Sequence, residues 1–149
     1  MAGKYFDEFV VGEEYVTPSR TLTETDIVLF AAMSGDYNEL HTSEAFGKET
    51  QFGKRIGHGL LGLAVSHGLF FRLGLVEGTA IAFLGLESWN FEAPFFIGDT
   101  ISAELTITET KALPRIGGGS IVAAIAVKNQ SDEICQRGSL NLLVLSKPK

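Results

Sequence analysis

The chain has 149 residues, of which 45% are hydrophobic, and its formal net charge is −6. A chain of this length can bury a full core as one domain, and the hydrophobic share excludes general disorder. Nucleic-acid binding requires clustered lysine and arginine, and the 12 such residues here form no basic run. We therefore expect one folded domain, residues 1–149, that does not bind nucleic acid.

The single cysteine, Cys135, excludes an intrachain disulfide and a cysteine zinc site, and it is typical of a reducing compartment. The first ten residues lack the apolar stretch of a secretory signal. The longest apolar segment, residues 59–71, is too short to span a bilayer. These features predict a cytoplasmic protein that does not enter the membrane.

The first regular elements are predicted between residues 15 and 35. A short strand over residues 15–22 is broken at Pro18. Thr23 is a good N-cap, and Asp26 stands three residues later, where a carboxylate favours the amides of the first helical turn. The helix that begins there should end near Gly35.

Residues 34–41 read Ser-Gly-Asp-Tyr-Asn-Glu-Leu-His, and we expect an irregular, turning segment that is neither helix nor strand. A turning backbone can direct Asp36 and His41 into one small volume. A carboxylate and an imidazole that converge there can hold and deprotonate a water molecule. After this segment, Ser43 should cap a short helical turn that ends at Gly47.

The second half of the chain changes from a helix to strands. Residues 59–73 are apolar nearly all the way round, which predicts a helix enclosed by other structure. Residues 101–107 and 121–127 alternate between two faces, and residues 140–145 form a last apolar strand. The glycines at 117–119 should form a flexible hairpin turn. One such helix and about four antiparallel strands indicate an α+β fold, with a curved sheet wrapped around the helix.

Residues 34–41, followed by Phe-Gly-Lys-Arg-Ile-Gly-His-Gly at residues 52–59, resemble the MaoC-like dehydratases, also called (R)-specific enoyl-CoA hydratases. The match covers most of the chain. It departs from the family pattern at Glu39, where proline is usual, and at Ser43, where aspartate is common. Ala64 also stands where some members have serine. The resemblance implies the hot dog fold, a long central helix wrapped by a curved antiparallel sheet.

The resemblance also implies a function, the hydration of trans-2-enoyl-CoA to (R)-3-hydroxyacyl-CoA or the reverse dehydration. Asp36 and His41 would be catalytic and would share the water molecule. Asn38, His58 and Gly59 would bind substrate, with the Gly59 amide serving the thioester oxygen at a helix N-terminus. No metal and no cofactor are implied. The partners would be an acyl-CoA substrate and a second copy of the chain, in a homodimer or a higher assembly of dimers.

The same residues have simpler interpretations. Taken alone, Asp36 could be a turn former, and His41 a solvated loop histidine. His58 could be structural, ordering the loop at the start of the helix, and His67 fits a buried or interface position. The spacing of these four residues matches no standard zinc pattern.

Two rival functions remain open at this point. A hot dog thioesterase would share the fold and the ligand but would release a free thiol. A non-catalytic acyl-thioester binding or regulatory module would not need a paired acid and imidazole. Lys54, Arg55 and Arg115 are candidates to bind the coenzyme A phosphates, or are ordinary solvated cations.

Overall fold

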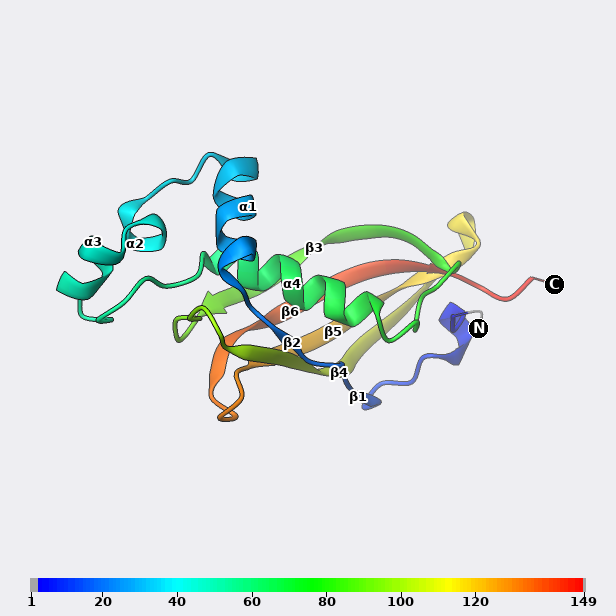
Figure 1. The fold of residues 1–149 in the computed structure, drawn as a ribbon. Helices are drawn as coiled ribbons and strands as arrows, with labels where there is room; N and C mark the ends of the chain where they lie inside the picture. The colour runs from blue at the N-terminus through cyan, green and yellow to red at the C-terminus, as the bar shows by residue number, and fades with distance from the viewer. Residues whose placement is uncertain (1–2, 149) are drawn as a thin grey trace.

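A computed structural model describes residues 3–148. Its frame is a six-stranded antiparallel sheet in the order β1-β4-β5-β6-β3, with β2 paired to β4. The central helix α4 lies across one face of this sheet, and α1, α2 and α3 lie toward one end of it (Figure 1). The predicted α+β class is therefore confirmed.

Four long strands make most of the sheet, and two short strands pair with β4. The long strands are β3 (Ala80–Phe91), β4 (Thr100–Leu113), β5 (Gly118–Lys128) and β6 (Ile134–Leu145), and the short ones are β1 (Glu14–Val16) and β2 (Arg20–Thr21). The alternation predicted for β4 is confirmed, because Ile101, Ala103, Leu105 and Ile107 are all buried. β6 begins six residues before the apolar segment that predicted it, since its first half contains polar residues.

Helix α1 (Glu24–Ser34) has the limits that its caps predict. Thr23 and Asp26 form a reciprocal capping box at its amino end. Gly35 closes the other end in the left-handed conformation, with φ of 79°. The helix therefore delivers the chain directly to Asp36.

The segment after Asp36 is more regular than expected. The prediction of an irregular segment up to His41 is wrong, because α2 (Glu39–Thr42) forms one helical turn. Helix α3 (Glu44–Glu49) also continues past Gly47, where it was expected to end. A Cβ atom at Gly47 would lie 2.6 Å from the backbone nitrogen of Arg55. The glycine therefore permits close packing of two backbone segments instead of ending the helix.

The glycine run 117–119 is not a flexible hairpin turn. Gly117 ends the short 3₁₀ helix η2 (Pro114–Ile116) with φ of 65°. Gly118 and Gly119 are buried in β5, where added Cβ atoms would strike the backbone of Val144 and the ring of Phe6. Phe6 lies on a second 3₁₀ helix, η1 (Phe6–Glu8). These two glycines are packing positions.

Helix α4 (Gly59–Phe71) is covered on one side only. Its buried residues include Leu61, Val65 and Leu69, which face the sheet. Leu60 is 60% exposed, and Ala64 is also exposed. The prediction of a fully enclosed helix is therefore wrong for the single chain, because the sheet covers just one face. None of the helices in residues 3–148 has the length and apolar character required to cross a bilayer.

Candidate active site

Short-range hydrogen bonds position Asp36 and His41. The Asp36 carboxylate accepts a hydrogen bond from the backbone N–H of Asn38 at 3.3 Å. The Asn38 side chain in turn accepts from the N–H of Leu40 at 3.0 Å and caps α2. Asn38 therefore orders the helical turn that carries His41. The four-residue helix, not a free loop, sets the direction of the imidazole.

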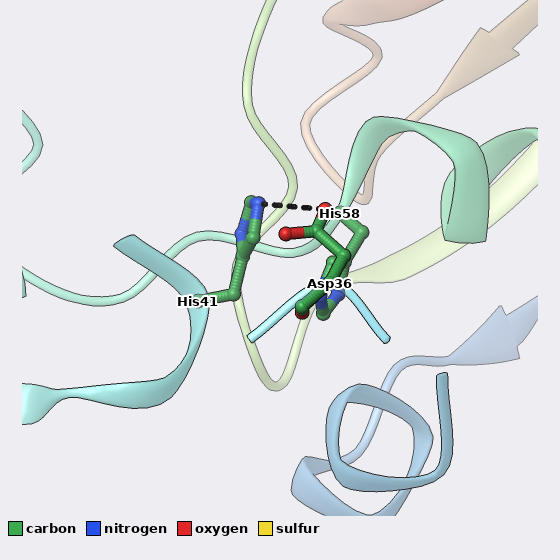
Figure 2. Close-up of side chains that lie close together, drawn as sticks. All are labelled: Asp36, His41 and His58. Carbon is green, nitrogen blue, oxygen red and sulfur yellow. Dashed lines mark hydrogen bonds and ion pairs between the residues drawn. The ribbon is translucent and has the colours of Figure 1, made fainter. Parts of the chain in front are cut away.

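The Asp36 carboxylate and the His41 imidazole face each other (Figure 2). Their nearest atoms, Oδ2 of Asp36 and Nε2 of His41, are 4.0 Å apart. This separation is too long for a direct hydrogen bond, but an oxygen atom between them could lie about 2.8 Å from both. The Asp36 side chain is 51% exposed and that of His41 is 12% exposed. The pair can therefore share one water molecule that arrives from solvent.

The tautomer of the neutral His41 ring follows from its second contact. Its Nδ1 lies 2.8 Å from the backbone oxygen of Ile56. A carbonyl oxygen only accepts hydrogen bonds, so Nδ1 must carry the proton. In the neutral ring, Nε2 then presents its lone pair toward Asp36. Two hydrogen-bond acceptors thus point at the same small volume.

His58 lies beneath this pair and is only 2% exposed. Its Nε2 donates to the backbone oxygen of Asp36 at 3.0 Å, and its ring stacks on that of His41 with centroids 3.9 Å apart. Its Nδ1 is buried and has no hydrogen-bond partner among the described residues. Burial lowers the pKa of His58, because a proton on Nδ1 would introduce an unpaired buried charge. His58 is therefore a neutral support for both catalytic candidates.

Asp36, His41 and His58 bring three potential metal ligands within 4.8 Å of one another. The two rings are nearly parallel, with an interplanar angle of 30°. The nitrogen lone pairs lie in the ring planes, and therefore in two nearly parallel layers. A zinc ion needs both lone pairs directed at one point, about 2.0–2.1 Å from each nitrogen. One nitrogen of each ring is also bonded to a backbone oxygen. The arrangement does not fit a metal site.

A cavity of about 500 Å³ opens beside His41 and Gly59. Its walls are mostly apolar and include Phe52, Ile56, Leu60, Phe91, Pro94 and Phe95. Apolar walls with a few polar groups are typical of a site for a small organic ligand. Of the five site residues expected from the sequence, His41 and Gly59 line this cavity. Asp36, Asn38 and His58 lie behind or beside His41 and do not line it.

Gly59 is the first residue of α4, so its N–H has no partner within the helix. A Cβ atom at this position would lie 2.8 Å from the ring of Phe91. The backbone oxygen of Gly59 accepts a hydrogen bond from the side chain of Gln136, which also lines the cavity. Sequence reasoning missed Gln136, because 77 positions separate it from Gly59. Its one signal is a polar residue shortly before the apolar segment at residues 140–145.

The candidate phosphate-binding cations are placed differently from one another. Arg55 forms ion pairs with Glu24 of α1 and Glu44 of α3, so it holds the helices together. Lys54 lies 4.2 Å from the ring centroid of Phe96. Arg115 lies on η2, at the end of the sheet away from α2 (Figure 1).

The chain is similar in sequence to several named proteins. The chain is 36% identical over 108 residues to an (R)-specific enoyl-CoA hydratase of Rhodospirillum rubrum, covering 70% of this chain and 69% of that protein. It is 42% identical over 103 residues to the protein MaoC of Klebsiella aerogenes. That match covers 69% of this chain but only 30% of the Klebsiella protein.

Solved structures support the fold. A structure described as a monoamine oxidase regulatory protein from Archaeoglobus fulgius is 34% identical, with a TM-score of 0.91, and the match covers 99% of this chain and 98% of that one. The R-hydratase PhaJ1 of Pseudomonas aeruginosa is 30% identical, with a TM-score of 0.79, over 96% of this chain and 86% of that one.

A Mycobacterium tuberculosis protein described as a double hotdog fold has a TM-score of 0.87 over 99% of this chain and 46% of that one. At 18% identity it shows the fold alone, and the predicted hot dog fold is confirmed. The family model described as a MaoC like domain matches residues 8–134. This match covers most of the chain, and the relatives described above include proteins named hydratases. The chain therefore belongs to the MaoC-like domain family.

Proposed function

We propose that the protein catalyses the (R)-specific hydration of trans-2-enoyl-CoA to (R)-3-hydroxyacyl-CoA, or the reverse dehydration. One observation carries the proposal. Two acceptors, the Asp36 carboxylate and Nε2 of His41, lie 4.0 Å apart, and His41 borders an apolar cavity at the amino end of α4. The relatives named (R)-specific enoyl-CoA hydratase and 3-hydroxybutyryl-CoA dehydratase support the same reaction class.

The paired acceptors suit the activation of water. A water molecule between them donates one hydrogen to each, so a lone pair of its oxygen remains free to attack C3 of the enoyl group. As the new C–O bond forms, one acceptor takes a proton from the water, and a proton from the acid–base pair is delivered to C2. The reaction therefore adds the elements of one water molecule and leaves the pair as it began. Positioned acid–base groups of this kind typically contribute about 10²–10⁴ to the rate.

The Gly59 amide is suited to the negative charge that develops on the thioester oxygen. Its N–H is unsatisfied within the helix and lies at the positive end of the α4 dipole. One such preorganised donor is worth about 10²–10³ in rate. The absence of a side chain at Gly59 lets a planar thioester approach. The apolar cavity walls would receive the acyl chain.

The proposal includes a homodimer with the acyl site near the subunit boundary. β3 pairs with β6 on one side and forms the open edge of the sheet. Exposed apolar side chains along it include Phe83 at 46% and Leu84 at 52% exposure. The unpaired N–H and C=O groups of a long apolar edge strand favour pairing with another chain. Leu60 and Phe91 of the cavity wall are also 60% and 54% exposed, so a second copy would complete the cavity.

Purified protein with crotonyl-CoA tests this proposal. Loss of the conjugated enoyl absorbance and release of free thiol are followed in the same sample. Enoyl loss without thiol supports hydration, and analysis of the product on a chiral column should give the (R)-3-hydroxy isomer. Release of free thiol would instead show that the protein is a thioesterase. Neither signal, together with measurable acyl-CoA binding, would point to a non-catalytic module.

A further inference from the structure

A buried carboxamide links the sheet to the first turn of α4. Gln136, on β6, is 1% exposed, although it is polar and stands within the apolar core. Its Nε2 donates to the backbone oxygen of Gly59 at 2.8 Å. Its Oε1 accepts from Nε1 of Trp89, on β3, at 3.2 Å. Three elements therefore meet at one side chain, next to the proposed oxyanion donor.

The chemistry of the partners allows only one orientation of this carboxamide. The indole nitrogen of Trp89 only donates, and the oxygen of Gly59 only accepts. If the amide were flipped, two donors would face each other, as would two acceptors. Such a buried mismatch is costly. Trp89 therefore fixes which end of the Gln136 amide faces the helix.

Two glycines make room for this arrangement. A Cβ atom at Gly62 would lie 2.5 Å from Nε2 of Gln136. A Cβ atom at Gly138 would lie 2.6 Å from the Trp89 ring. Glycine is a poor residue for the interior of a helix or a strand. At both positions it permits the close approach that the hydrogen-bonded chain of Trp89, Gln136 and Gly59 requires.

We propose that Gln136 is a positioning residue for the oxyanion site. Gly59 must lack a side chain for the thioester to approach, but a glycine has more backbone freedom than any other residue. Without a further contact, the Gly59 N–H would therefore not keep the fixed direction on which electrostatic stabilisation depends. The hydrogen bond from Gln136 to the Gly59 oxygen holds the adjoining peptide and restores that direction. Gln136 acts through the backbone of Gly59.

This inference rests on the proposed hydratase function, and it predicts how the kinetic constants divide. A misdirected donor weakens the interaction with the developing enolate more than it weakens binding of the ground state. Gln136→Leu should therefore lower kcat about 10–100-fold, because a small misplacement of a catalytic group is that costly. KM should change by less than about threefold, since the interaction is made mainly in the transition state.

Gln136→Glu gives a readout that a purely structural role would not give. The ionised carboxylate has no hydrogen to donate and repels the Gly59 oxygen, whereas the protonated form can donate to it. The kcat of this variant, relative to wild type, should therefore rise as the pH falls. The same ratio for Gln136→Leu should stay flat with pH. Trp89→Phe, which removes the group that orients the amide, should lower kcat less than Gln136→Leu does.

The contact itself can be measured without activity. The chain has one tryptophan, so its indole N–H gives one resonance in an NMR spectrum. This resonance should shift and exchange faster with solvent in Gln136→Leu. If Gln136→Leu does not fold, the double variant Trp89→Phe/Gln136→Leu removes both polar partners together and leaves neither group unpaired. The double variant should show the same loss of kcat.

The outcomes separate the two proposals. A wild-type protein that does not hydrate any enoyl-CoA would end the proposed function, and this inference with it. A wild-type protein that hydrates crotonyl-CoA, with folded Gln136→Leu or double variants whose kcat is within twofold of wild type, would overturn the positioning role alone. A parallel pH dependence of the Glu and Leu variants would also overturn it.

Discussion

Asp36 and the neutral imidazole of His41 face each other as two acceptors because a backbone contact selects the tautomer of that imidazole. The oxygen of Ile56 holds the proton on Nδ1 of His41, so the lone pair of Nε2 is left toward Asp36. An asparagine at position 36 would present an amide N–H group that can donate directly to that lone pair. The substitution would therefore change the hydrogen-bond pattern as well as the charge.

For this reason, Asp36→Asn should lower the hydration rate by about 10²–10⁴ and leave the fold intact. The Asp36 side chain is 51% exposed, so little packing is lost. Initial rates with crotonyl-CoA measure the effect, and circular dichroism checks the fold. Glu39→Gln is a matched control, because it removes a carboxylate from the neighbouring exposed surface of α2. Near-normal turnover in Asp36→Asn would show that the carboxylate has no part in the chemistry.

His58 should make the stability of the protein depend on pH. Burial depresses its pKa in the folded state below the ordinary value of 6.5. As the pH falls through that value, the unfolded chain therefore binds a proton that the folded protein does not, and the folded state is stabilised less. The groups that face the ring include Phe30, His41 and the Asp36 segment, and none of them provides a partner for Nδ1.

The expected result is that the free energy of unfolding of the wild type falls between pH 7.5 and about pH 5. His58→Phe keeps a ring against His41 but cannot titrate, so its loss over the same range should be smaller. Urea unfolding at several pH values measures both slopes. Some dependence should persist in the variant, because burial also lowers the pKa of His67. Equal slopes would show that His58 is not held neutral in the folded state.

At the scale of the helix, two glycines of α4 have different tasks and should respond differently to the same substitution. In Gly59→Ala, the nearest atoms to the new methyl group would be those of the Phe91 ring, which is 54% exposed and can turn away. In Gly62→Ala, the methyl group would meet Gln136 and Phe95, which are almost fully buried.

Gly59→Ala should therefore change the free energy of unfolding by less than about 1 kcal/mol. It should lower kcat by about 10²-fold, because the methyl group and the displaced Phe91 ring would both obstruct the cavity beside the donor. Gly62→Ala should destabilise the fold by about 1–3 kcal/mol through overpacking. Urea unfolding and initial rates, measured on both variants, give the comparison. A stable and fully active Gly59→Ala protein would show that the proposed oxyanion site does not require a residue without a side chain.

The elements could be predicted from the sequence wherever the signal is local. The Thr23 and Gly35 caps gave the limits of α1, and the alternation in residues 101–107 gave the buried face of β4. Helix α2 has no periodic signal because its four residues are too few to show one, and Asn38, which caps it, is equally typical of a turn. Gln136 was missed because its partners, Gly59 and Trp89, are brought to it only by the tertiary fold.

At the scale of the whole molecule, one group of exposed apolar side chains gathers between α4 and the edge strand β3. A groove of about 330 Å³ runs between the open face of α4 and β3, and is lined by Leu60, Leu63, Ala64, His67, Phe83 and Leu86. The apolar pattern of residues 59–73 predicted a helix enclosed on all sides. In one chain the sheet covers one face of this helix, and in the dimer that we propose a second copy would cover the other face. The sequence pattern would then fit the proposed dimer better than it fits the single chain.

Phe83→Lys should test this assembly. The ring of Phe83 packs against His67 of α4 with centroids 5.1 Å apart and remains 46% exposed at the open edge of the sheet. A charge at this position would have to be buried in the proposed dimer, which is unfavourable without a partner. We expect the wild type to have the mass of a dimer by light scattering, and Phe83→Lys to shift toward the monomer and lose activity.

Val11→Lys, at a 55% exposed position of the segment that precedes β1, is the control and should stay dimeric and active. A monomeric wild type with full hydratase activity would show that the cavity of one chain is sufficient, and that the open face of α4 has another purpose.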